Sequence, residues 1–440
     1  MWIRNARILT FDDTNRVIDD GAVRVDDAVF GWVGPANQAA IPPGEKVLEA
    51  RGKLLMPALI NCHTHLYSTL ARGIELRGKP PKNFPEILRK LWWRLDRALN
   101  SDDVYYSALV GLIDCAKAGL GTLVDHHSSP NACRGSLDRV AQAFEEVGLR
   151  GCLCYETTDR NGAANAKAGL SENMRFLERL RRQPHPLLQA SFGLHASFTL
   201  QERTLERCVE AARGLDAGFH IHVAEDRCDV VDARRRFGRT PVKRLSERDV
   251  LGERSLAAHC VHVNAADIAL LARRQVNVVH NPQSNCNNAV GTTKLLEMVK
   301  AGVLVGLGSD GYTPRLWEEF KTAFHVQKLR RGDPRVAYAE AYAVAFLNNR
   351  QIVKKIWGLD LGRIAAGASA DFILVDYYPP TPIHAGNLFG HLLFGIAHAP
   401  VDTLMVNGKI VVQDKTCVNV DEAAVAERAR AQARALWQRF

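Results

Sequence analysis

The middle of the chain alternates short apolar runs with segments whose apolar residues recur at helical spacing. The apolar runs predict eight strands, at residues 54–62, 120–126, 149–157, 187–195, 217–223, 255–260, 276–281 and 303–309. Helical patterns fall between them, for example at residues 137–146, 172–181, 205–213 and 266–273. Eight such units in succession predict an α/β fold, a closed (β/α)8 TIM barrel of parallel strands ringed by helices.

The two ends of the chain have a different pattern. Residues 1–55 and 365–415 contain short strand-like stretches separated by turns. Neither half is large enough to form a stable sheet alone, so we expect them to join in one small β-sandwich beside a barrel of residues 56–364. Residues 421–440 are rich in Ala and Arg and predict a terminal helix.

The composition is that of an ordinary globular protein, with 47% hydrophobic and 24% charged residues among 440. No apolar run approaches the ~20 residues that a membrane helix needs, and the N-terminus has no secretory signal pattern. The ten cysteines are scattered, which predicts free thiols and a cytoplasmic protein. The net charge of +9 comes from dispersed Lys and Arg residues, which argues against nucleic-acid binding and leaves attraction of anionic substrates as a weaker interpretation.

Candidate chemistry starts at His63 and His65, at the end of the first predicted strand. Side chains alternate along a strand, so these two imidazoles lie on one face and can hold one metal ion. Two unrelated surface histidines are the alternative. The later strands favour the metal site, because His222, His259 and Asp310 also follow predicted strands, and a (β/α)8 barrel carries its chemistry at the C-terminal strand ends.

A second His-x-His pair, His220 and His222, lies on the fifth predicted strand, and Glu225 follows on the next loop. Both histidines share a face, so periodicity alone does not choose between them. His222 is the better ligand candidate because it is nearer the C-terminal end of the strand. Glu225 would then lie above the metal, where a carboxylate can take a proton from water and give it to a leaving nitrogen. An exposed loop glutamate is the alternative.

His259 ends the sixth predicted strand and can bind metal or hydrogen-bond a metal-bound water. Asp310, between Ser309 and Gly311 after the eighth strand, can ligate through one oxygen and accept a proton through the other; a turn aspartate is the alternative. His126 belongs to the end of the second strand, where a pocket-lining role and a packing role are both open.

Together these motifs resemble the amidohydrolase superfamily, and more closely its mononuclear aminohydrolase and chlorohydrolase branch, which includes guanine, cytosine and methylthioadenosine deaminases. The resemblance spans nearly the whole chain, including residues 362–372, which are similar to the family's return to its β-sandwich. Residues 91–99 and 156–161 are most similar to aminohydrolases encoded near selenium-dependent molybdenum hydroxylases.

The resemblance implies a role for each residue. It implies metal ligation by His63, His65, His222 and Asp310, a proton shuttle at Glu225, and positioning of the hydrolytic water by His259. It also implies substrate contacts, at His195 and near the Trp-rich segment, where Asp96 stands in place of a more usual Glu; His126 is a further candidate. The fourth predicted strand contains no Lys, and binuclear relatives carry a carboxylated lysine there, so one divalent metal per chain is expected. Zinc suits three His and one Asp, and iron is also compatible.

The sequence therefore predicts a metal-dependent hydrolase that deaminates an aminated nitrogen heterocycle, such as a purine, pterin or triazine. A cyclic amide hydrolase of hydantoinase type and a non-catalytic barrel scaffold are the alternatives, and a metal count discriminates the first of them. A small-molecule substrate and a homodimer are expected, with no nucleic-acid or membrane partner.

Overall fold

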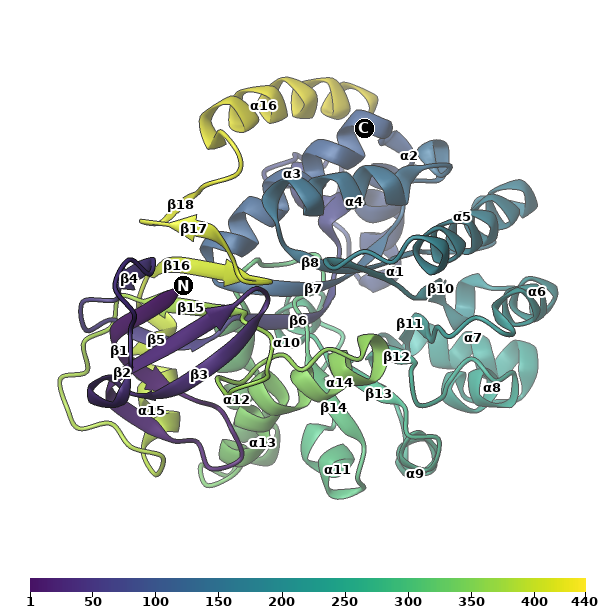
Figure 1. Cartoon of the computed structure of the whole chain (residues 1–440). Helices are drawn as coiled ribbons and strands as arrows, with labels where there is room; N and C mark the ends of the chain where they lie inside the picture. The colour runs from purple at the N-terminus through teal and green to yellow at the C-terminus, as the bar shows by residue number, and fades with distance from the viewer.

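The computed structural model describes residues 1–440, and its centre is a barrel of parallel strands surrounded by helices (Figure 1). The barrel strands are β6 (Leu59–Thr64), β7 (Leu120–His127), β8 (Arg150–Tyr155), β9 (Leu188–Ala190), β10 (Phe192–Ala196), β11 (Phe219–Val223), β12 (Leu256–His259), β13 (Asn277–His280) and β14 (Leu304–Leu307). β9 and β10 are one strand interrupted at Ser191, so the barrel has the eight strand positions that the sequence predicts. The predicted (β/α)8 barrel is confirmed.

Two parallel sheets make up the barrel, β6-β7-β8-β9 and β10-β11-β12-β13-β14. Two isolated parallel bridges join them: Thr157 pairs with Leu194 on one side, and Thr64 pairs with Asp310 on the other. The second bridge brings the end of β14 beside the end of β6. Residues that follow these two strands are therefore neighbours in space.

Helices occupy most of the connections between the strands and also follow the last strand, and most of them cover the outside of the barrel. They are α1 (Phe84–Ile87), α2 (Trp93–Ala98), α3 (Ser101–Lys117), α4 (Ser136–Val147), α5 (Ala163–Arg182), α6 (Glu202–Ala212), α7 (Arg227–Phe237), α8 (Pro241–Glu247), α9 (Ala265–Arg273), α10 (Pro282–Asn287), α11 (Leu295–Lys300), α12 (Leu316–Arg331), α13 (Tyr338–Tyr342), α14 (Asn348–Trp357), α15 (Leu388–Phe394) and α16 (Glu422–Arg439). The four helical patterns named from the sequence correspond to α4, α5, α6 and α9. Capping boxes fix the starts of α3 and α9. In each box the side chain of an Asn accepts from the backbone N–H of an Asp, and the side chain of that Asp accepts from the backbone N–H of the Asn.

Strands from both ends of the chain form one nine-stranded sheet beside the barrel, with β4 pairing β1 at its side. Its strands are β1 (Trp2–Leu9), β2 (Val17–Asp26), β3 (Val29–Pro35), β4 (Val47–Glu49), β5 (Leu54–Pro57), β15 (Phe372–Val375), β16 (Val401–Val406), β17 (Lys409–Gln413) and β18 (Thr416–Cys417). The purple N-terminal strands and the yellow C-terminal strands adjoin in Figure 1. The sheet curls over its own apolar core, so that Phe30 of β3 contacts Phe372 of β15, with ring centroids 6.2 Å apart.

The first predicted strand, 54–62, is wrong as one strand, because the chain changes sheets within it. The N–H of Ala58 donates to the carbonyl of Asp371 in the small sheet, and the N–H of Leu59 donates to the carbonyl of Gly119 in the barrel. The residues before Ala58 therefore form β5 and those after it form β6. The predicted boundary at 55/56 falls inside β5, which pairs entirely with the small sheet.

The C-terminal helix α16 lies over α3 on the outside of the barrel (Figure 1). The indole N–H of Trp437 donates to the carbonyl of Leu70, 2.8 Å away, in the 3₁₀ helix η2 (Leu66–Ala71). None of the helices is both long enough and apolar enough to cross a bilayer. All ten cysteines are unpaired, as the scattered spacing predicts.

Candidate active site

Polar side chains gather at the C-terminal ends of the barrel strands, where the sequence places the chemistry. They follow or end β6, β7, β8, β10, β11, β12 and β14: His63, His65, His126, Glu156, His195, His222, Glu225, His259 and Asp310. Because parallel strands end at one rim of the barrel, these residues come together although they span about 250 residues of sequence.

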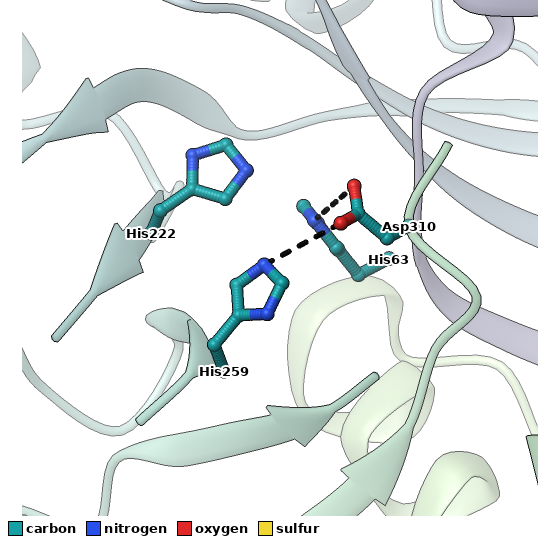
Figure 2. Close-up of side chains that lie close together, drawn as sticks. All are labelled: His63, His222, His259 and Asp310. Atoms are coloured by element: carbon teal, nitrogen blue, oxygen red, sulfur yellow. Dashed lines mark ion pairs between the residues drawn. The ribbon is translucent and has the colours of Figure 1, made fainter. Parts of the chain in front are cut away.

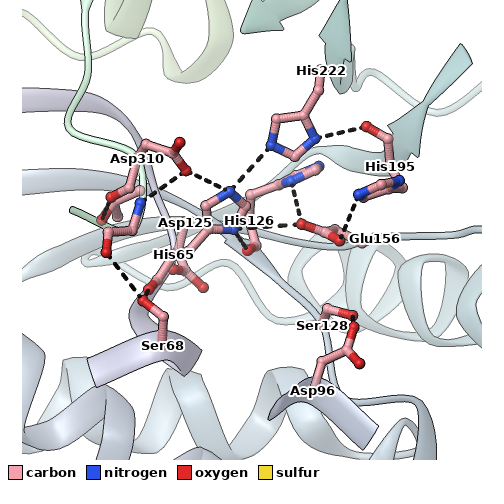
Figure 3. Close-up of polar contacts among 12 residues, drawn as sticks. His65, Ser68, Asp96, Asp125, His126, Ser128, Glu156, His195, His222 and Asp310 are labelled. Atoms are coloured by element: carbon pink, nitrogen blue, oxygen red, sulfur yellow. Dashed lines mark hydrogen bonds and ion pairs between the residues drawn. The ribbon is translucent and has the colours of Figure 1, made fainter. Parts of the chain in front are cut away.

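Four histidines and Asp310 point toward a common centre. Donor atoms of His63, His222, His259 and Asp310 all lie within 4.8 Å of one another (Figure 2). His65 also reaches this centre, because its Nε2 lies 3.0 Å from Oδ1 of Asp310 and 3.1 Å from Nε2 of His222 (Figure 3). The structure thus gathers the four ligands predicted from the sequence and adds His259 at the same point.

Hydrogen bonds at the far side of the rings fix which nitrogen faces this centre. In three rings Nδ1 lies within hydrogen-bond distance of an acceptor that carries no proton: His65 on the carbonyl of His126 (2.6 Å), His222 on the carbonyl of His195 (2.7 Å) and His259 on Oδ1 of Asn285 (2.8 Å). A ring that donates through Nδ1 presents the lone pair of Nε2. This tautomer is the one that a metal ligand needs.

Two of these Nε2 atoms have no partner in the protein, and the other two face each other beside Asp310. Those of His63 and His259 are buried without a hydrogen bond. Those of His65 and His222 face each other at 3.1 Å, which sets two lone pairs against one another when both rings donate through Nδ1. A cation among them would relieve both problems, and an aspartate beside them supplies negative charge. The donor set therefore fits a divalent metal such as zinc.

The structure also settles which histidine of the second pair faces the centre. His220 is fully buried, and its Nε2 lies 2.8 Å from Nδ1 of His63. His220 therefore orients His63 from behind, while His222 presents its ring to the centre. Periodicity left this choice open, and the position of His222 nearer the strand end favoured the ring that faces the centre; its role as a metal ligand stays a prediction.

The strand ends adopt unusual backbone conformations. Ala224, His259 and Asp310 have positive φ values of 47°, 70° and 54°, in the left-handed region that L-residues other than Gly seldom occupy. Such conformations cost free energy and persist where the surrounding structure holds them, often at functional sites. Gly308 permits a close approach as well, because a Cβ there would meet Oδ1 of Asn281 at 2.4 Å and Cβ of His63 at 2.9 Å.

Glu225 lies at the edge of the same centre, on the loop after β11. Its Oε2 is 3.7 Å from Nε2 of His259, which is itself 3.7 Å from Oδ2 of Asp310. Burial, and then the negative charge of Asp310, hold the pKa of Glu225 well above its usual range. Burial lowers the pKa of His259 and so keeps its ring neutral.

A cavity opens above this centre. One wall is apolar and mainly aromatic: Phe84, Leu88, Trp92, Trp93 and Phe198. The lining also carries polar groups, which include His65, Glu156, Arg160, His195, His222, Glu225, Ser284, Asn288 and Asp310. A flat ring with polar edges matches these surroundings, since aromatic walls suit a planar ligand and polar groups fix its orientation.

The three predicted substrate contacts differ in position. His195 lines the cavity, whereas Asp96 and His126 lie behind its wall and are fully buried. Asp96 accepts a hydrogen bond from Ser128 at 3.0 Å and pairs with Arg160. Direct contact between Asp96 or His126 and a substrate therefore stays a prediction that this geometry does not favour.

Sequence reasoning gave no role to Glu156 and Arg160, which do line the cavity. Both follow β8, in a loop of polar residues without periodicity. The available signal was position alone, since Glu156 lies near the end of the predicted barrel strand at residues 149–157.

A (β/α)8 barrel with this His/Asp cluster at its strand ends is the arrangement of a metal-dependent hydrolase. The chain belongs to the amidohydrolase family, whose model matches residues 54–411. A 5-methylthioadenosine/S-adenosylhomocysteine deaminase of Desulforudis audaxviator is 33% identical, over 99% of each chain. A 5'-deoxyadenosine deaminase of Methanosarcina mazei is 31% identical over 99% of this chain and 98% of its own.

Among solved structures, an adenosine deaminase from Xanthomonas campestris with bound zinc superposes with a TM-score of 0.87. The match covers 100% of this chain and 98% of the other at 23% identity, and it supports the fold. The narrower resemblance to aminohydrolases encoded near selenium-dependent molybdenum hydroxylases stays a prediction.

Proposed function

We propose that this protein is a metal-dependent aminohydrolase that removes an amino group, as ammonia, from a nitrogen heterocycle such as a purine, pterin or triazine. The observation that carries the proposal is the meeting of a His/Asp cluster and the carboxyl of Glu225 at the floor of one aromatic-walled cavity. The two relatives described above, named as deaminases of adenosine derivatives, make a purine the first class to test.

The proposed metal ligands are His63, His65, His222 and Asp310, as the sequence predicts, with His259 beside them. The unpartnered Nε2 atoms and the neighbouring carboxylate support one divalent ion, with zinc first and iron second. A bound zinc would supply a Lewis acid that lowers the pKa of a coordinated water toward ~7.

The residues of the chain then manage protons and orientation. Glu225 accepts a proton from the attacking water and delivers it to the departing amino group, a role that suits a carboxyl whose pKa is raised by burial. Nε2 of the neutral His259 ring and Oδ2 of Asp310 lie 3.7 Å apart, and together they hold that water on the side of Glu225. The apolar wall excludes bulk water and holds the ring of the substrate.

The two alternative functions that the sequence leaves open differ from the proposed deaminase in their products and in their metal content. A cyclic amide hydrolase would open a ring and release no ammonia, and it would favour two metals per chain. A scaffold without activity would bind a ligand and turn over none. The predicted homodimer and the cytoplasmic location stay predictions, and light scattering of the purified protein tests the first.

The decisive experiment measures ammonia release from a panel of aminated purines, pterins and triazines by zinc-loaded protein, together with the metal content. We expect ammonia from at least one heterocycle and close to one metal per chain. His63→Ala should lose most of the metal and the activity together, whereas Cys286→Ala, at an exposed thiol, should change neither. Full metal retention in His63→Ala would overturn the ligand assignment, and ring opening without ammonia would replace the proposed reaction.

A further inference from the structure

Beyond the metal cluster, the cavity has a second polar region formed by Glu156 and Arg160. Both residues line the cavity and both side chains are almost fully buried, with exposed fractions of 2% and 7%. Nothing in the proposed proton transfer uses either of them. Two buried charged groups facing a cavity are costly to maintain unless their remaining hydrogen-bonding capacity meets a partner.

Glu156 offers an acceptor to the cavity. Its Oε1 is held by Nδ1 of His126 at 3.1 Å (Figure 3). The other oxygen, Oε2, lies 3.9 Å from Nε2 of His195 and 3.9 Å from Nη2 of Arg160, and both separations exceed hydrogen-bond range. One oxygen therefore anchors the carboxylate and the other remains free to accept from a ligand.

His195 offers a second acceptor beside it. Nδ1 of His195 lies 2.7 Å from Oγ1 of Thr199, and that hydroxyl donates to the carbonyl of Ala196. The hydroxyl proton is thus in use, so the ring donates through Nδ1 and its Nε2 carries a lone pair. An N–H of a ligand placed between Nε2 of His195 and Oε2 of Glu156 would find two acceptors.

Arg160 supplies the complementary donors. Its Nη2 pairs with Asp96 and donates to Oγ of Ser128 at 2.9 Å, which fixes the guanidinium in place. Its Nε is buried without a partner, and Cζ of its guanidinium lies 5.3 Å from the ring centroid of Trp93. The side chain therefore has fixed geometry and unused N–H groups in the cavity wall.

We propose that Glu156 and Arg160 form a specificity subsite for a lactam edge, an N–H adjacent to a C=O on the ring of the substrate. Glu156, with His195, accepts from the N–H, and Arg160 donates to the carbonyl oxygen. The preferred substrate is therefore an oxo-substituted aminoheterocycle, free of a sugar on that edge. This inference rests on the proposed deaminase function and deepens it.

The energetics favour strong discrimination. A site built to hydrogen-bond a polar group rejects an analogue without that group by up to ~10⁴–10⁵-fold, because the buried partners are left unpaired. The aromatic wall alone would accept a ring with the oxo group and the same ring without it about equally well. The subsite therefore controls the preference for the oxo-substituted ring over its unsubstituted analogue.

Two pairs of purines test this with zinc-loaded protein, whichever carbon carries the reacting amine. 6-Amino-2-oxopurine is compared with adenine, and 2-amino-6-oxopurine with 2-aminopurine. In at least one pair we expect kcat/KM for the oxo member to be higher by about 10²-fold or more. Equal kcat/KM values in both pairs, or faster turnover of the rings without the oxo group, would overturn the inference while leaving deamination established.

Substitutions of Glu156 and Arg160 test whether these residues cause the preference for the oxo-substituted purine. Glu156→Gln replaces an acceptor oxygen by an N–H₂ group of the same size, and Arg160→Gln removes the charged donors. Each should reduce the preference to below about tenfold by slowing the oxo member, with unchanged zinc content. Arg330→Gln is the matched control, because it makes the same exchange at a surface ion pair with Glu297, away from the cavity, and should keep the preference. A preference that survives in both Glu156→Gln and Arg160→Gln would overturn the assignment of these residues.

A binding measurement separates this inference from the proposed reaction. Xanthine carries lactam edges and no amino group, and unsubstituted purine carries neither. Calorimetry on the wild type should give xanthine a Kd at least about tenfold lower than that of purine, and Glu156→Gln should remove the difference. Xanthine preference without ammonia release from any substrate would refute the deaminase and support the subsite. Ammonia release with equal Kd values would refute the subsite alone.

Discussion

Glu225 is the residue on which the proposed proton transfer depends. Glu225→Gln keeps the size and the hydrogen-bonding reach of the side chain but cannot carry a proton between water and the amine. We expect normal metal content with kcat lower by about 10²-fold or more, as is usual for the loss of general acid–base catalysis. Steady-state kinetics and elemental analysis of the same preparation check this. Near-native kcat would move the role to His259 or Asp310, and lost metal would make Glu225 a ligand.

Asp229 of α7 supports the loop that carries Glu225. One oxygen accepts from the N–H of Ala224 at 2.8 Å, and the other accepts from the N–H of Phe198 at 2.9 Å. Burial nevertheless raises the pKa of Asp229 to about 7, above the ordinary value of 3.8. Between those two values the folded protein binds a proton that the unfolded chain lacks. The contribution of this carboxyl to stability is therefore largest at low pH, falls as the pH rises toward 7, and is constant above that.

Asp229→Asn should remove this pH dependence. The unfolding free energy of the wild type, relative to the variant, should fall between pH 5 and 7 by up to about 1.4 kcal/mol per pH unit. Urea unfolding of both proteins at pH 5, 6, 7 and 8 measures the difference, and Asp232→Asn on the same helix controls for the loss of a carboxylate. A difference that stays constant across this range would contradict the prediction.

At the scale of the residue, alternation along a strand fixes which side chains share a face, and this placed His63 and His65 together at one strand end. Alternation did not separate His222 from His220, and His222 was chosen because it lies nearer the end of its strand. Glu156 and Arg160 were given no role, because Glu156 lies at the very end of its predicted strand and Arg160 lies in the loop beyond, where no period reveals the direction of a side chain. Asp96, predicted as a substrate contact, lies behind Arg160, a position that depends on how separate loops pack, and its contact with a substrate stays a prediction.

The element that merits a direct test is α16, which reaches back to the cavity wall. Besides the bond from Trp437 to Leu70, the side chain of Arg94 in α2 donates to the terminal carbonyl of Phe440. These contacts hold η2 and α2, which flank residues of the ligand cluster and of the aromatic wall. Deleting residues 437–440 should raise KM more than it lowers kcat, because the wall loosens while the metal cluster stays.

Steady-state kinetics of the truncated and full-length proteins, on whichever heterocycle is turned over best, check this prediction. Arg428→Ala is the control, since that side chain is exposed on the same helix and makes no hydrogen bond. A truncated protein with unchanged KM would show that α16 does not support the cavity wall.

Elements were predicted better than their boundaries. Each of the eight barrel positions overlaps a predicted range, with ends that differ by up to a few residues, because apolar runs and helical spacing are local properties of the sequence. The passage from β5 to β6 at Ala58 was missed, since residues 54–62 are apolar on both faces in either sheet. Only the hydrogen-bonding partners, Asp371 and Gly119, distinguish the two strands, and both are remote in sequence.

At the scale of the whole molecule, one buried ion pair ties the barrel to the small sheet. Arg150 of β8 makes two bonds to the carboxylate of Asp371, at 2.7 and 3.1 Å, and a third to Asn407 of the hairpin between β16 and β17. Both charged side chains are almost fully buried, with exposed fractions of 2% and 3%. The pair therefore joins the two parts of the molecule at a point from which water is excluded.

Arg150→Met should destabilise the protein by about 3–5 kcal/mol, because it leaves the carboxylate of Asp371 buried without a counter-charge. Arg330→Met, which removes a surface pair with Glu297, should cost below about 1 kcal/mol. Chemical denaturation of both variants measures these values. Equal effects of the two substitutions would mean that the buried pair does not hold the sheet to the barrel.

The mixed origin of the small sheet has a consequence for how the chain is made. β5 pairs with β1 on one side and with β15 on the other, and about 360 residues separate β1 from β15. At 5–20 residues per second, the ribosome needs roughly 20–70 s to add the strands that complete the sheet. The outer edge of β5 therefore spends that time unpaired, and the apolar core that the two halves of the sheet share closes only after the C-terminal strands have been synthesised.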